Sequence, residues 1–290
     1  MSYITNALVA AILLATPAQS EIAQINGAEI YYTTVGTGVP VMIMHGGLGL
    51  DHTYLRPYFD ALEDRAQVIY YDHLGNGQSA HPVDFAELTF DRFVADADAL
   101  RAYLGHEKII LIGHSYGGFI AQEYAAAHSD RLLGLVLSNT VPVFDYAPTL
   151  SGTDEQMAAL GQVFSRPMES DEDFRSNWNI ISQMYYKEYD PKVGAALDAK
   201  THYSYAAWNV ANGLLATFNT TDKLASINVP TLVIGGAHDG ITPVDPGAAR
   251  IDGLLPNSEM IVFENSGHFP FIEEQTLYFN ALGAWIDKIK

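Results

Sequence analysis

The sequence predicts an α/β protein, built on a mostly parallel sheet with helices on both faces and a helical cap inserted between two strands. Short apolar runs of strand length alternate with segments whose apolar residues recur at helical spacing, which is typical of a parallel sheet covered on both faces. The alternation is interrupted once, between residues 142 and 226. The 290 residues are 48% apolar and 17% charged, so the chain can fold around a large core.

Seven apolar segments have the length and composition of strands. The first ends at a Gly36-Thr37-Gly38 turn, and the second is apolar throughout, as expected of a strand buried on both faces. The predicted strands are residues 28–35, 39–44, 67–71, 108–113, 132–137, 231–234 and 260–263.

Helical patterns lie between and after these strands, at residues 52–63, 89–104, 117–127 and 271–289. Residues 142–226 contain no convincing buried strand and are polar, acidic and rich in aromatic side chains. An unstructured loop of this length is rare in a compact domain. We therefore expect 142–226 to be a small helical cap over the carboxyl edge of the sheet, with residues 21–141 and 227–290 forming the core.

The first twenty residues predict a signal peptide or, alternatively, an N-terminal extension. Residues 7–15 are a compact apolar run, and Ala18-Gln19-Ser20 suits a cleavage site before Glu21. The run is too short to span a bilayer. No Lys or Arg precedes it, so a cytoplasmic location stays as the alternative to a periplasmic or secreted one.

The net charge limits the kinds of molecule that the protein is expected to bind. With 34 acidic and 15 basic residues, the chain has a net charge of -19, and neither nucleic acid nor an anionic membrane attracts such a surface. The sequence contains no cysteine, which excludes disulfides, thiolate nucleophiles and thiolate metal sites. We expect a small-molecule substrate, no nucleic acid and no stable membrane association, and the oligomeric state stays open.

A Gly-x-Ser-x-Gly motif, Gly113 to Gly117, joins a predicted strand directly to a predicted helix. Glycines two before and two after Ser115 let the strand and the helix approach closely, while the serine takes a strained backbone conformation and presents its hydroxyl. The alternative is a serine that only caps a helix. The strand–turn–helix setting favours Ser115 as a nucleophile.

A serine nucleophile needs a base, and the base needs an acid that orients it. His268 follows the strand 260–263, just before the last predicted helix, and Asp239 follows the strand 231–234. The order Ser115, Asp239, His268 is a known chain order for such a triad. Two rivals for the acid are Asp245 nearby and Asp145, which follows the strand 132–137.

The Gly-rich segment after the strand 39–44 is the predicted source of an oxyanion hole. His45-Gly46-Gly47-Leu48-Gly49 can turn sharply, so that the N–H of Gly47 points to the place where negative charge develops on a substrate carbonyl. The N–H of Tyr116 is the expected second donor. We interpret His45 as a structural hydrogen-bonding residue.

On these motifs, the chain resembles capped α/β-hydrolase-fold proteins over residues 21–290. The resemblance implies an eight-stranded α/β-hydrolase sheet, and within that superfamily it is nearest to proline iminopeptidase-like enzymes and small esterases or lactonases. Two positions depart from the iminopeptidase pattern, with Leu48 where proline is common and Tyr116 where tryptophan is common. The carrying segments are residues 45–49, 72–79, 113–118, 236–243 and 266–270.

The predicted mechanism is two-step acyl transfer without a metal or cofactor. An aminopeptidase must also hold a substrate ammonium, for which Glu188 or Asp190 are candidates. The cap aromatics suggest an apolar or ring-bearing substrate, although most of them are expected to be packing. The predicted substrate-binding residues are Leu48, Trp178, Tyr185, Trp208 and Phe269.

Three functions stay open on the sequence alone. The first is a hydrolase of an ester, lactone or amide, the second is a hydrolase of a carbon–carbon bond beside a ketone on the same scaffold, and the third is a non-hydrolytic ligand-binding protein that keeps the triad. In this fold, epoxide hydrolases and dehalogenases resemble one another in having aspartate where this chain has Ser115, which argues against both.

Overall fold

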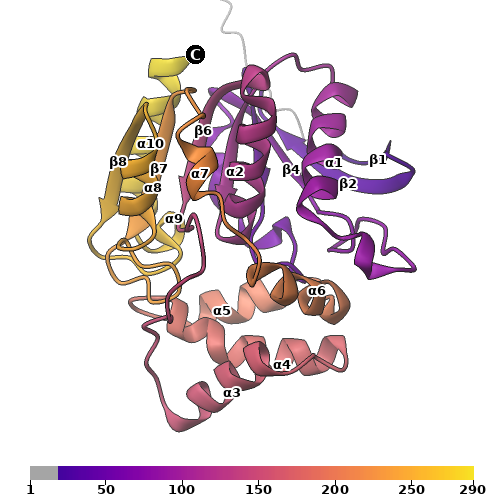
Figure 1. The fold of residues 1–290 in the computed structure, drawn as a ribbon, viewed down its shortest axis with the longest axis vertical. Helices are drawn as coiled ribbons and strands as arrows, with labels where there is room; N and C mark the ends of the chain where they lie inside the picture. Colours follow the sequence, from indigo (N-terminus) through magenta and orange to yellow (C-terminus); the bar gives the residue numbers. More distant parts are fainter. Residues whose placement is uncertain (1–18) are drawn as a thin grey trace, which may run out of the picture.

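The computed structural model describes residues 19–290, which form an eight-stranded sheet in the order β1-β2-β4-β3-β5-β6-β7-β8 (Figure 1). The pairs β1–β2 and β2–β4 are antiparallel, and every pair from β4 to β8 is parallel. The predicted mostly parallel sheet is thus confirmed. The strands are β1 (Gln19–Ile25), β2 (Ala28–Val35), β3 (Val39–Met44), β4 (Ala66–Tyr71), β5 (Ile109–His114), β6 (Leu132–Ser138), β7 (Thr231–Gly236) and β8 (Ser258–Phe263).

β1 is the strand that sequence patterns did not predict. It pairs with β2 through a two-residue turn in which Asn26 and Gly27 have φ angles of 48° and 82°, the geometry of a tight hairpin. β1 begins at Gln19, two residues before the position at which we expect the core to start. The apolar run 7–15 lies outside the described residues.

Alternate residues of the central strands face two separate cores. In β5, Ile109 and Leu111 pack into one core, while Ile110 and Ile112 pack into the other, as the period of two in a strand requires. Helices cover both faces, and Figure 1 shows α1 and α2 over one of them. The first core includes side chains of α1 (Phe90–Tyr103), α2 (Tyr116–His128), α7 (Thr221–Leu224) and α8 (Ala248–Leu254), and the second includes those of η2 (Tyr58–Leu62), α9 (Pro270–Glu273) and α10 (Gln275–Ile289).

Two predicted helices are broken in the structure. Residues 52–63 form two 3-10 turns, η1 (His52–Tyr54) and η2, separated by Pro57, which has no N–H to continue a helix. The closing helix is divided into α9 and α10 at Glu274, whose φ and ψ are -120° and 45°. Two further 3-10 turns are η3 (Phe85–Glu87) and η4 (Ser129–Arg131).

Residues 142–226, called here the helical insertion, connect β6 to β7. In Figure 1 the helices α3 to α6 lie together beyond one end of the sheet. The acidic run near residue 170 has a local role, because Ser170 caps α4 and three carboxylates follow in its first turn, where they complement the helix dipole. The other elements are α3 (Asp154–Ser165), α4 (Asp171–Ile181), η5 (Ser182–Tyr185), α5 (Pro191–Asp198) and α6 (Tyr205–Leu215), followed by α7.

The strand register places the predicted functional segments at one edge. Met44 of β3 pairs with Gly113 of β5, and His114 pairs with Ser138 of β6. Parallel strands therefore end together, and the segments that follow β3, β5, β6, β7 and β8 leave the sheet at the same carboxyl edge. This is the edge at which open α/β sheets bind ligands.

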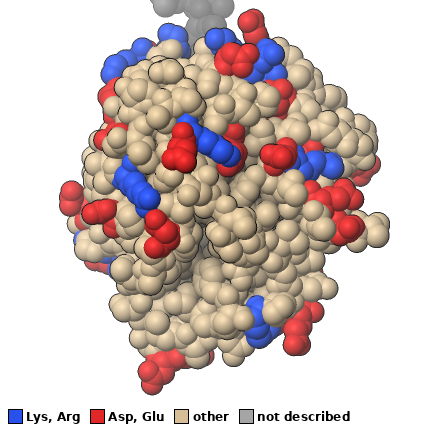
Figure 2. Space-filling view, in the orientation of Figure 1, with Lys and Arg blue, Asp and Glu red and all other residues tan. Residues whose placement is uncertain are grey.

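The surface in Figure 2 carries acidic and basic side chains interspersed over the sheet domain, without one continuous patch of either sign. Some acidic and basic side chains form ion pairs, and Arg250, for example, lies 3.0 Å from Asp145. Across residues 19–290, the helices are too short or too polar for any of them to cross a membrane.

Candidate active site

Ser115 lies at the corner between the end of β5 and the start of α2. Its φ of 55° and ψ of -122° lie in a region that L-residues rarely adopt. α2 begins at Tyr116, whose N–H consequently has no acceptor within the helix. From Ile109 to Gln122 every residue is buried except Ser115. The corner therefore presents the Ser115 hydroxyl to a pocket that Ser115 lines.

Gly113 and Gly117 are required because α2 lies very close to β5 and β3, and not because of their backbone angles. A Cβ on Gly113 would lie 2.6 Å from the Cβ of Ala121, and a Cβ on Gly117 would collide with the carbonyl oxygen of Met44. Side chains at these two positions would push α2 away from β5 and β3. The Gly-x-Ser-x-Gly spacing thus lets the helix begin directly beside the strand ends.

His268 and Asp239 are in direct contact, on the loops that follow β8 and β7. His268 Nδ1 lies 2.8 Å from Asp239 Oδ2. Because a carboxylate only accepts hydrogen bonds, Nδ1 carries the hydrogen, and Nε2 of the neutral ring keeps a free lone pair. His268 lines the same pocket as Ser115. The structure therefore brings the three predicted side chains to one site.

Five hydrogen bonds hold the Asp239 carboxylate. Besides His268, Oδ2 accepts from Thr242 Oγ1 at 2.7 Å and from Asn139 Nδ2 at 2.9 Å. Oδ1 accepts the N–H groups of Ile241 and Thr242 at 2.9 and 3.0 Å. Burial would raise the pKa of Asp239, but the charge of His268 and these hydrogen bonds hold the pKa far below its usual range. Asp239 is therefore an anion at neutral pH.

The two rival acids lie elsewhere. Asp145 forms an ion pair with Arg250 at 3.0 Å and is half exposed. Asp245 precedes Pro246 in the loop before α8 and makes no hydrogen bond to His268 among those of the described residues. Only Asp239 of the three contacts the imidazole.

A chain of hydrogen bonds joins the Gly46 segment to the loop of His268. The Gly46 N–H donates to Tyr54 Oη at 2.7 Å, Tyr54 Oη lies 2.7 Å from His114 Nδ1, and His114 Nε2 lies 2.9 Å from the His268 carbonyl oxygen. Since a carbonyl only accepts, His114 Nε2 donates and His114 Nδ1 accepts from Tyr54. Burial, followed by the charge of His268, lowers the pKa of His114 to about 3. His114 is thus a neutral structural link rather than a second base.

Gly47 lies beside Ser115, and no described residue accepts a hydrogen bond from its backbone N–H. Its φ is 55°, and a Cβ on the preceding Gly46 would lie 2.7 Å from the Ser115 Cβ. The Tyr116 N–H is likewise free of an acceptor in residues 19–290. His45 is 1% exposed, and its Nε2 accepts the His73 N–H at 3.2 Å. Its contacts are those of a structural residue.

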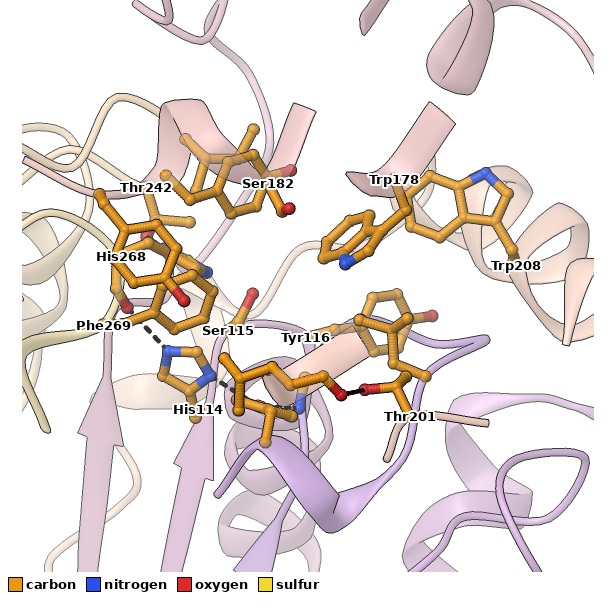
Figure 3. A pocket seen from close by; sticks show the side chains of 18 of the residues that line it. His114, Ser115, Tyr116, Trp178, Ser182, Thr201, Trp208, Thr242, His268 and Phe269 are labelled. Carbon is orange, nitrogen blue, oxygen red and sulfur yellow. Dashed lines mark hydrogen bonds between the residues drawn. The ribbon is translucent and has the colours of Figure 1, made fainter. Parts of the chain in front are cut away.

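The pocket lies between the carboxyl edge of the sheet and the helical insertion, and Figure 3 shows the side chains of 18 of the residues that line it. Four of the five predicted substrate-binding residues line it: Trp178, Tyr185, Trp208 and Phe269. Leu48 does not, which corrects that prediction. It is 1% exposed and packs into the first core, while Leu50, two residues later, lines the pocket.

Glu188 and Asp190, the predicted ammonium ligands, are not among the residues that line the pocket. The acidic side chain that does line it is Asp198, the only one in the described residues around this cavity. Arg175 Nη2 lies 2.7 Å from Asp198 Oδ2, and Asn179 and Tyr203 each donate to Oδ1 at 2.9 Å. The hydrogen bond from Arg175 lowers the pKa of Asp198 to about 2. The negative charge of Asp198 is therefore balanced by Arg175 within the protein.

The helical insertion is hydrogen-bonded directly to the loop that carries His268. The His268 N–H donates to the Tyr185 carbonyl oxygen at 2.6 Å. Glu273 accepts the Gly267 N–H through Oε2 and the Lys187 N–H through Oε1, both at 2.7 Å. A movement of the insertion at these residues would therefore move the imidazole.

Sequence patterns missed the residues that support the site, namely Asn139, Thr242, Tyr54 and Glu273. Asn139 offered one usable signal, because it lies two residues after the end of a predicted strand, as Ser115 does. Within residues 19–290, no group of three or more His, Cys, Asp or Glu side chains is arranged to hold a metal ion.

Known proteins resemble this chain in sequence and in fold. The family model for the alpha/beta hydrolase fold matches residues 39–275. A proline iminopeptidase of Lactobacillus helveticus is 30% identical over 287 residues, covering 90% of this chain and 95% of its own. Among solved structures, an esterase from Exiguobacterium antarcticum is 23% identical with a TM-score of 0.78, covering 93% of this chain and all of its own. The enol-lactonase of Burkholderia xenovorans is 20% identical with a TM-score of 0.75, covering 92% of this chain and all of its own.

Proposed function

Because the chain belongs to the alpha/beta hydrolase fold family and is a hydrolase, we propose that it is a serine hydrolase of small, uncharged carboxylic esters or lactones. Ser115 is the nucleophile, His268 the general base and Asp239 the acid that orients it. The contact between His268 and Asp239 at 2.8 Å supports these roles, as does the strained corner at Ser115.

In this mechanism His268 Nε2 takes the proton of Ser115 as Oγ attacks the substrate carbonyl. The N–H groups of Gly47 and Tyr116 stabilise the oxyanion, and the leaving group departs with the proton from His268. His268 then activates water, which releases the acyl group from Ser115. Asp239 keeps the proton on Nδ1 throughout and stabilises the imidazolium.

The observation that favours esters and lactones over N-terminal peptides is the charge of the pocket. A free ammonium would need a carboxylate that is not already paired. Asp198, the acidic side chain in the lining, is bound by Arg175 and two neutral donors. Apolar side chains such as Phe144, Phe164 and Leu215 form much of the remaining wall. An uncharged, partly apolar acyl or alcohol group fits this environment.

We also propose that the helical insertion, residues 142–226, is a cap that selects the substrate. It supplies Trp178, Tyr185 and Trp208 to the pocket, whereas the proposed catalytic side chains all come from the sheet domain. Chemistry and selection would then reside in separate parts of the chain.

A fluorophosphonate probe tests the catalytic assignment. We expect it to label the wild type at Ser115 and to leave a folded Ser115→Ala variant unlabelled. A folded wild type that does not react would refute the serine-hydrolase proposal. Turnover of p-nitrophenyl acetate, a lactone panel and proline p-nitroanilide then tests the substrate class, and a preference for the proline amide would overturn the assignment to uncharged substrates.

A further inference from the structure

The indole N–H of Trp178 is a hydrogen-bond donor in the insertion's wall of the pocket that the protein leaves unused. Trp178, on α4, lines the pocket, and no described residue accepts a hydrogen bond from its indole Nε1. In Figure 3 the nitrogen of Trp178 points into the space above Ser115 and Tyr116. An indole nitrogen can only donate, so any partner that it has in this pocket must be an acceptor.

The second tryptophan of the same cluster shows that the unused donor is a local feature. Trp208 lies 6.2 Å from Trp178 between ring centroids. Its Nε1 donates to the Val163 carbonyl oxygen at 3.1 Å, inside the helical insertion. Both rings line the pocket, yet only Trp208 has its N–H satisfied by the protein.

Neighbouring rings hold the Trp178 indole in place. Phe174 lies 6.0 Å away and Tyr185 lies 5.5 Å away at an interplanar angle of 75°. Tyr185 in turn meets the His268 ring edge-on at 5.3 Å. The donor is therefore fixed two ring contacts from the proposed base, close enough to meet a group on the same small substrate.

We propose that the substrate carries a second acceptor oxygen, such as an ether, hydroxyl or keto oxygen beside the scissile ester or lactone, which binds the Trp178 N–H. This inference rests on the proposed function. A donor fixed in a partly apolar pocket favours substrates that satisfy it, and it disfavours analogues that exclude water without supplying an acceptor. The substrate class narrows from small uncharged esters to oxygen-substituted ones.

Pairs of p-nitrophenyl esters test the proposal, each pair differing only by an ether oxygen in place of a methylene. Methoxyacetyl, 3-methoxypropanoyl and 4-methoxybutanoyl esters place the oxygen at three distances from the carbonyl, and butanoyl, pentanoyl and hexanoyl esters are their isosteres. The measured quantity is the ratio of kcat/KM within a pair, divided by the ratio of the hydroxide-catalysed rates. This division removes the inductive effect of the oxygen.

We expect the wild type to prefer the ether in at least one pair, and Trp178→Phe to reduce that preference about three- to tenfold, the size of one neutral hydrogen bond. Trp208→Phe should leave the ratio unchanged, whatever it does to the overall rate. An equal effect of Trp178→Phe on both members of every pair would overturn the proposal, because it would mean that the ring only packs.

The wild-type ratios keep the inference falsifiable if Trp178→Phe does not fold. No ether preference in any pair would mean that the N–H is simply hydrated, and would refute the inference. Such an enzyme would still label with fluorophosphonate and hydrolyse the all-carbon esters. Failure of the proposed function is a different result, in which the folded wild type does neither.

Discussion

The support of Asp239 by Asn139 can be tested by substituting the asparagine. Asn139 directly follows β6, is 1% exposed and has a φ of 50°. Its Nδ2 donates to Asp239 Oδ2 at 2.9 Å and to the Gly267 carbonyl oxygen at 3.2 Å. The side chain thus connects the acid to the loop of His268. Asn139→Gly removes the amide but tolerates positive φ, whereas Asn139→Ala removes the amide and also disfavours the backbone conformation.

The loss of the amide hydrogen bonds and the backbone strain at positive φ cost different amounts of folding free energy, so the two variants can separate them. A hydrogen bond to a buried charge contributes about 1.5–3 kcal/mol, and Asp239 is that charge. Glycine adds about 0.5–1 kcal/mol of chain entropy to the cost. We therefore expect Asn139→Gly to lower the free energy of unfolding by about 2–4 kcal/mol. Asn139→Ala should cost about 1 kcal/mol more, because alanine is strained at positive φ.

Urea unfolding at neutral pH measures the stability, and steady-state hydrolysis of p-nitrophenyl acetate by the folded fraction measures the activity. We expect kcat to fall with little change in KM, because Asn139 is not among the residues that line the pocket. Wild-type stability and kcat in Asn139→Gly would refute a supporting role for the amide. An alanine variant that is more stable than the glycine variant by about 0.5–1 kcal/mol, the chain entropy of glycine, would show that the positive φ stores no strain.

Two further predictions concern carboxylate–histidine pairs. Asp239→Asn should reduce kcat about 10⁴-fold with folding intact, while Asp145→Asn should hydrolyse p-nitrophenyl acetate at near-normal rates; near-normal turnover by Asp239→Asn would refute the assignment of the acid. In the second pair, His202 Nδ1 of the insertion lies 2.7 Å from Asp51 Oδ2, and this hydrogen bond raises the pKa of His202 above 6.5. The raised pKa means that the pair stabilises the fold fully below pH 6.5 and that this contribution is lost as pH rises through the folded-state pKa. We expect the urea-derived stability of the wild type to fall as the pH rises above about 6.5, and the fall to be smaller in His202→Asn; an identical slope in the variant would contradict this role.

Sequence patterns predicted the parts of the fold in which neighbouring residues determine the geometry. The buried strands and the helices α1 and α2 were predicted within two residues of their observed ends, because their apolar residues recur at the period of the element. β1 was not predicted because its alternating pattern is short and follows a segment that resembles a signal peptide. Ala23 and Ile25 alternate with polar residues over only a few positions, directly after a segment with the features of a signal peptide. The pairing with β2 that makes it a strand is a tertiary interaction.

The same distinction applies to the pocket. The corner at Ser115 could be predicted because the glycines that allow it lie two residues away on either side. Leu48 was wrongly predicted as a lining residue. In a tight Gly-rich turn, side chains two positions apart can face opposite sides, and here Leu50 faces the pocket in place of Leu48. Which of Leu48 and Leu50 points inward depends on packing against Phe174 and Trp208 in the insertion, and no local pattern records that packing.

The supporting contacts join positions far apart in the chain. Asn139 lies 100 residues before Asp239 and 128 before Gly267, and Glu273 binds backbone N–H groups of the insertion 85 and 86 residues before it. Every residue except proline has a backbone N–H, so residue type does not reveal which N–H groups Glu273 binds. The link between Glu273 and the insertion could therefore not be predicted from composition or spacing. Yet this link ties the segment that we propose selects the substrate to the loop that holds His268. A substrate that shifts Trp178 or Tyr185 would therefore also shift the imidazole, so selection by the insertion should be visible in kcat and not in KM alone.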